Sequence, residues 1–80
     1  MSATKKKIVR FLKSPKTSSY ADLLTILVYF GFEKVQTRGS HVKFKHLYFS
    51  NDLVIPVHNN ECKHFYKIEA RKRILKLVNK

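Results

Sequence analysis

Acidic residues are scarce in this sequence. Five Asp and Glu stand against 17 Lys and Arg in 80 residues, which gives a formal net charge of +12. The basic residues occur near the N-terminus, in the middle and along the last third, so the excess charge is not confined to one tail. A chain that is basic throughout repels itself until it meets anions, which favours a polyanionic partner, nucleic acid first and an acidic protein or anionic membrane after it. The composition carries no information about sequence specificity.

Cysteine and long apolar runs are also scarce. Cys62 is the only cysteine, which excludes an internal disulfide, and the Cys and His positions lack the spacing of a zinc site. The longest apolar run, residues 23–32, is interrupted and is about half as long as a membrane-spanning helix. The lysine-rich segment 5–13 is too short and too charged for a signal peptide. We therefore expect a cytoplasmic protein with no membrane contact, no metal and no other cofactor.

Eighty residues suffice for one small domain of two layers, but not for a large enclosed active site. Residues 4–13 have apolar side chains at helical spacing, and Pro15 ends that helix. Ser19 and Asp22 fit a capping box that starts a second helix, and Gly31 suits its end. Two helices are therefore expected before residue 32.

Three short strands are predicted next, at residues 32–38, 41–49 and 53–57. Pro56 cannot donate a backbone hydrogen bond, so the third strand should have an open edge there or end close by. Asn59 or Asn60 can cap a last helix with an apolar side and a basic side. The expected basic side consists of Lys63, Lys67, Arg71, Lys72, Arg73 and Lys76.

The order helix, helix, three strands, helix predicts an α+β fold, with helices packed on one face of a three-stranded antiparallel sheet. The opposite face of the sheet is expected to be open and basic. We expect residues 1–80 to form a single domain, in which residues 1–17 are an N-terminal helical extension.

The turn between the first two expected strands holds the sharpest candidate site. Strand alternation places His41, Lys43 and Lys45 on one face and turns the apolar side chains between them the other way. An imidazole beside a column of ammonium groups is a place for a phosphate. The predicted RNA-binding residues are Arg38, Gly39, Ser40, Lys43 and Lys45, of which the three cations are expected to hold the phosphate.

RNA supplies its own nucleophile, the 2′-hydroxyl. A ribonuclease therefore needs a base for that proton, in-line geometry and positive charge on the phosphoryl transition state. His41 can be the base, and the neighbouring cations can hold the phosphate. Two alternatives stay open from the residues alone: His41 is an ordinary surface residue beside a turn, or the chain is a non-catalytic RNA- or DNA-binding module of the same fold.

The other histidines have weaker claims. His58 can protonate the leaving 5′-oxygen, bind a phosphate or occupy a turn, and we interpret it as structural because nothing in the sequence fixes its distance to His41. His46 alternates with apolar positions, which indicates a half-buried, hydrogen-bonded residue. His64 falls in the basic helix, where we expect it to be solvated.

Several features occur together in one order: Leu-x-x-x-Gly-Phe at 27–32, Gly-Ser-His at 39–41, Ile-Pro-Val-His at 55–58 and a basic final helix ending in Arg-Ile-Leu-Lys at 73–76. In these features the chain resembles the HicA family of small mRNA interferase toxins over about residues 19–76. The family's Gly-Thr-Leu-Arg segment at the start of the last helix is replaced here by Phe-Tyr-Lys-Ile at 65–68.

The resemblance implies a double-stranded-RNA-binding-like fold and metal-independent cleavage of mRNA, with His41 as the catalytic residue. It also implies that a HicB-type antitoxin neutralises the protein, as in a type II toxin–antitoxin system. The expected helix at residues 4–13 lies outside the minimal pattern of the family.

Overall fold

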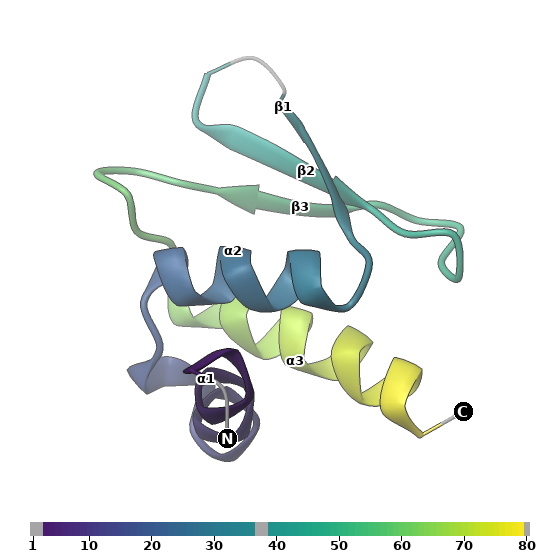
Figure 1. Ribbon diagram of the computed structural model, residues 1–80. Coiled ribbons are helices and arrows are strands. Elements are labelled where there is room, and N and C mark those ends of the chain that lie inside the picture. Colours follow the sequence, from purple (N-terminus) through teal and green to yellow (C-terminus); the bar gives the residue numbers. More distant parts are fainter. Residues whose placement is uncertain (1–2, 37–38, 80) are drawn as a thin grey trace.

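The computed structural model describes residues 3–36 and 39–79 (Figure 1). The elements in chain order are α1 (Ala3–Lys13), a short 3-10 helix η1 (Pro15–Thr17), α2 (Tyr20–Tyr29), β1 (Glu33–Gln36), β2 (His41–Lys45), β3 (Leu53–Pro56) and α3 (His64–Val78). The strands form one antiparallel sheet in the order β1-β2-β3. The helices lie on one side of it, with α2 and α3 nearest the sheet and α1 farther away (Figure 1). This is the α+β fold that the sequence predicts.

Local signals set both ends of α2. The Ser19 hydroxyl accepts a hydrogen bond from the Asp22 N–H at 3.2 Å, so Ser19 is the N-cap, as predicted. At the other end, the N–H of Phe32 reaches the carbonyl of Leu27 and the N–H of Gly31 reaches that of Val28, both at 3.0 Å. Gly31 has a φ of +92°. This pair of bonds is a Schellman motif, and it turns the chain from α2 into β1.

The core lies between the sheet and the helices. Its fully buried side chains come from all three helices and from β2 and β3: Phe11, Leu23, Ile26, Leu27, Phe44, Ile55, Ala70 and Ile74. Helix α1 contributes Ile8 and Phe11 to this core, and the Arg71 Nε of α3 donates to the Leu12 carbonyl in its last turn at 2.7 Å. No helix among the described residues is long and apolar enough to cross a membrane.

The start of α3 differs from the prediction. Asn59 and Asn60 have φ angles of +52° and +60° and form a two-residue turn between His58 and Glu61. The backbones of His58 and Glu61 exchange hydrogen bonds of 2.8 and 3.0 Å across this turn. Asn tolerates the left-handed conformation better than most residues, so the pair serves as a tight turn. The expected Asn cap is therefore wrong, and α3 begins after Lys63, which makes no side-chain cap bond.

The predicted basic side of α3 is only half correct: Lys63, Lys72 and Lys76 are exposed, but the other three basic residues have partners within the fold. Lys67 is 3% exposed, whereas Phe65, expected on the apolar side, is 62% exposed. Arg71 donates to the backbone of α1, and Arg73 donates to the carbonyls of Asn51 and Asp52. Three of the six basic side chains that were expected to face solvent, Lys67, Arg71 and Arg73, therefore bond to other parts of the molecule.

Candidate active site

His41 is the first residue of β2 and is exposed. Strand alternation puts its side chain on the face opposite the buried Phe44, which is the face that the helices leave uncovered. The cross-strand partner of His41 is Pro56, the last residue of the edge strand β3. Directly opposed side chains share a face, so the Pro56 ring lies beside the imidazole. Beyond this pair, the Val57 N–H donates to the Ser40 carbonyl at 2.7 Å and holds the turn before His41. As predicted for the third strand, β3 lies at the edge of the sheet and ends at Pro56.

The five predicted RNA-binding residues differ in their surroundings. Lys43 and Lys45 follow His41 on the same face of β2, and Gly39 stands in an exposed turn with a φ of +69°. Ser40 is half-buried, and its carbonyl accepts the N–H of Val57, the residue just after β3. Arg38 lies outside the described residues.

Acidic side chains share this face with the lysines. Glu33 is the cross-strand partner of Lys45, and the Asp52 carboxylate lies 4.0 Å from the Lys43 ammonium. The open face therefore carries balanced charge at these positions, in contrast to the uniformly basic face expected from the composition. A phosphate that binds Lys43 therefore competes with the Asp52 carboxylate.

His46, just beyond the end of β2, has a different environment. Its Nε2 lies 2.9 Å from the Phe30 carbonyl, and its Nδ1 accepts the Tyr48 N–H at 2.9 Å. Because a backbone N–H can only donate, Nδ1 is unprotonated and Nε2 carries the hydrogen. The rings of Phe32 and Phe49 pack on it, with centroids 4.8 and 5.6 Å away. The interpretation of His46 as a half-buried, satisfied histidine is confirmed.

His58 lies at the same end of the sheet as His41, two residues after Pro56. Its backbone forms the turn with Glu61, and its exposed side chain lines a pocket between β3 and α3. His64, the first residue of α3, is exposed as expected. Across residues 3–36 and 39–79, no three His, Cys, Asp or Glu side chains gather closely enough to hold a metal ion.

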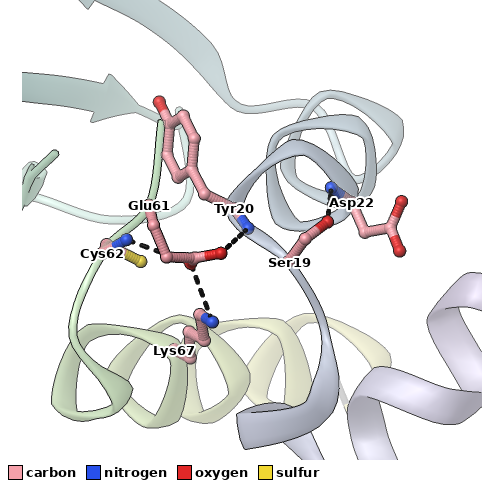
Figure 2. A network of polar contacts seen from close by, with 6 residues as sticks. All are labelled: Ser19, Tyr20, Asp22, Glu61, Cys62 and Lys67. Carbon is pink, nitrogen blue, oxygen red and sulfur yellow. Dashed lines mark hydrogen bonds and ion pairs between the residues drawn. The ribbon is translucent and has the colours of Figure 1, made fainter. Parts of the chain in front are cut away.

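A polar network beneath this end of the sheet escaped the sequence analysis (Figure 2). The Glu61 carboxylate lies 2.9 Å from the Lys67 ammonium and accepts the N–H groups of Cys62 and Tyr20 at 3.0 and 3.3 Å. The hydrogen bond from Lys67 lowers the pKa of Glu61, and burial raises the pKa of the Cys62 thiol. Through this one carboxylate, the turn at 58–61 is tied to the first residue of α2 and to α3.

A sequence signal for this network did exist. Lys67, Ala70 and Ile74 follow the i, i+3, i+7 spacing of one buried helix stripe, and all are buried. The helical spacing alone therefore predicts that Lys67 is buried, and a buried lysine needs a partner of opposite charge.

Comparison with known proteins shows which family the chain belongs to. Residues 20–77 match the family model described as "HicA toxin of bacterial toxin-antitoxin". No curated protein and no solved structure matches the chain. The matched segment runs from the first residue of α2 nearly to the end of α3 and includes His41, Pro56 and Glu61, whereas α1 and η1 precede it. Because the match spans well over half of the 80 residues, the chain belongs to the HicA toxin family of bacterial toxin–antitoxin systems.

Proposed function

We propose that this protein is an mRNA interferase, an endoribonuclease that cuts mRNA without a metal ion and is neutralised by a HicB-type antitoxin. The position of His41 carries the proposal. It stands within the segment that matches the toxin family, exposed on the uncovered face of the sheet and next to two lysines of the same strand. A substrate as large as RNA can reach an imidazole there without any opening of the fold.

In the proposed reaction, the neutral His41 imidazole accepts the proton of the 2′-hydroxyl, and the 2′-oxygen attacks the adjacent phosphorus in line. The bond to the 5′-oxygen breaks, and that oxygen takes a proton from the imidazolium, from water or from His58. The products are a 2′,3′-cyclic phosphate and a 5′-hydroxyl. Lys43, Lys45, Arg38 and the backbone of the Gly39-Ser40 turn stabilise the negative charge that develops on the phosphoryl oxygens.

A second function is favoured by the charge balance of the open face. Because Glu33 and Asp52 lie beside the two lysines of β2, the chain can also be a non-catalytic binding module in which His41 is an ordinary RNA contact. The two functions share the fold and the net charge, so they must be separated by the chemistry.

The test compares wild type, His41→Ala and His64→Ala on a long single-stranded mRNA with EDTA present, followed by mapping of the fragment ends. We expect wild type and His64→Ala to cut equally, because His64 is exposed at the start of α3. His41→Ala should cut about 100- to 10,000-fold more slowly, the usual contribution of a general base. A substrate with 2′-deoxyribose at the cut position should be resistant.

Three outcomes contradict this mechanism: dependence on added magnesium, cleavage of an all-deoxy substrate, or equal cleavage by His41→Ala. If no variant cuts but all bind RNA with the same salt-dependent affinity, the chain is a binding module. Circular dichroism of each variant checks that the fold is retained.

A further inference from the structure

A pocket of about 320 Å³ lies beside the candidate active site, where the end of β3, the turn at 58–61 and the start of α3 meet. Its lining residues are Pro56, His58, Glu61, Cys62, Lys63 and Tyr66. The volume falls in the range of small-ligand sites, about 300–1,000 Å³. It is large enough to hold one flat ring system and open enough to admit it from the surface.

The register of the sheet places this pocket next to His41. Pro56 is the cross-strand partner of His41 and is also a lining residue of the pocket. Opposed side chains on one face of an antiparallel pair have Cβ atoms about 4.5–5.5 Å apart. Pro56 is therefore the residue that links the pocket to His41, at the edge of the sheet.

The lining suits an unstacked base. Tyr66 supplies an aromatic ring that is half-buried and packs against the core. Within the part of the chain that the structure describes, the His58 ring, the Lys63 ammonium and the Tyr66 hydroxyl have no hydrogen-bond or ion-pair partner. Proteins that recognise single-stranded RNA commonly stack splayed bases on aromatic rings and hydrogen-bond to their edges.

A larger pocket, of about 510 Å³, lies near the loop between β2 and β3 but has less to offer a ligand. Its central cation, Arg73, already donates to the carbonyls of Asn51 and Asp52 and lies over the Phe49 ring at 5.3 Å. It is also at the far end of the sheet from His41, because residues 51 and 52 precede the partner of Phe44.

We propose that the pocket beside Pro56 binds a base of the substrate RNA next to the cleaved phosphate and so determines the cleavage-site preference. Tyr66 stacks on the base, and His58 and Lys63 contact its edge or the flanking phosphate. This inference rests on the ribonuclease function proposed above. It makes Tyr66, His58 and Lys63 specificity-determining residues in addition to the histidine that does the chemistry.

The experiment maps cleavage sites on the same long mRNA for wild type, Tyr66→Leu, Tyr66→Phe and the control Phe65→Leu. Phe65 neighbours Tyr66 on α3 but is 62% exposed and does not line the pocket. Tyr66→Leu should lower kcat/KM at the preferred sites by about 5- to 150-fold, the range that loss of one base–aromatic stack produces, and should flatten the preference at one nucleotide position. Tyr66→Phe keeps the ring and Phe65→Leu leaves the pocket intact, so both should keep the wild-type pattern.

A double variant, His58→Asn with Lys63→Gln, provides a second reading in case Tyr66→Leu does not fold. Both of these side chains are exposed, so the fold should persist while the contacts to the base edge are lost. If wild type cuts and both the leucine and the double variant keep the same sites and rates, the pocket proposal is overturned and the ribonuclease function stands. If wild type does not cut RNA at all, the two proposals fail together.

Discussion

His41, the first residue of β2, and His46, just after its last residue, lie in different environments. His46 has both ring nitrogens bonded to backbone groups, and a Cβ added at Gly31 would come within 3.3 Å of its Nε2. His41 is exposed beside Pro56 and next to a pocket. The two residues are an odd number of positions apart in an extended chain, so their side chains point to opposite faces. Register in the strand, more than residue type, decides which histidine can meet a substrate.

The largest effect on stability should come from the packed end. His46→Ala removes the partners of the Phe30 carbonyl and the Tyr48 N–H and leaves a hole between two aromatic rings. We expect the free energy of unfolding to fall by about 2–4 kcal/mol. His41→Ala should change it by about 0.5 kcal/mol or less, as is usual for an exposed side chain. Urea unfolding followed by circular dichroism measures both.

The rate of RNA cleavage should rank the His46→Ala and His41→Ala variants in the opposite order. Per folded molecule, the His46→Ala variant should cut RNA at the wild-type rate, while His41→Ala should cut about 100- to 10,000-fold more slowly. If His46→Ala retained its unfolding midpoint but lost cleavage, His46 would take part in catalysis. The proposed difference between His41 and His46 would then be wrong.

A smaller effect should come from Glu61, which supports the exposed end from below. Glu61→Gln leaves the buried Lys67 ammonium without its carboxylate. Because the Glu61 side chain is 49% exposed, water can replace part of the interaction. We therefore expect a loss of about 1–2 kcal/mol at neutral pH, below the 3–5 kcal/mol of a fully buried pair. Unfolding midpoints of the two proteins at pH 7 check this value.

The same carboxylate predicts a pH dependence. The pKa of Glu61 is lowered in the folded state, chiefly by its hydrogen bond to Lys67. Its stabilising contribution is therefore complete above the ordinary glutamate value of 4.5 and is lost as the pH falls through the lowered folded pKa. The stability difference between wild type and Glu61→Gln should shrink over this acid range. A difference that stayed constant down to about pH 2 would show that Glu61 acts without its charge.

The sequence predicted the parts of the fold that depend on local signals. Ser19 and Gly31 mark the ends of α2 because a cap hydroxyl and a left-handed glycine act on their own neighbours. Asn59 and Asn60 were misread because asparagine favours both helix caps and left-handed turns, and only the pairing of His58 with Glu61 decides between them.

The candidate site was predictable only along β2 itself. Alternation within one strand gives the shared face of His41, Lys43 and Lys45, but the residues across from them depend on the register between strands. That register brings Glu33, Asp52 and Pro56 to the site. The pocket depends on the packing of α3 against the end of β3, which no local pattern contains.

A small effect on stability should come from Asp52, which pairs with Lys43 on the open face of the sheet. Its carboxylate lies 4.0 Å from the Lys43 ammonium, and both side chains are about a third exposed. Such a pair contributes about 0–1 kcal/mol, so Asp52→Asn should leave the unfolding midpoint nearly unchanged. It should, however, release Lys43 for phosphate and strengthen binding of RNA several-fold at low salt, a gain that fades as salt screens the charges.

Binding should be measured in a His41→Ala background, where the RNA stays intact. Glu69→Gln is the matched control, because it also removes a carboxylate from a lysine, Lys72, at 3.5 Å, but on α3 and away from the open face of the sheet. Equal gains from the two variants would mean that RNA senses only the net charge. Weaker binding by Asp52→Asn would mean that the carboxylate orients Lys43 for the phosphate. A gain confined to Asp52→Asn would show that Lys43, on the same face of β2 as His41, exchanges the Asp52 carboxylate for an RNA phosphate.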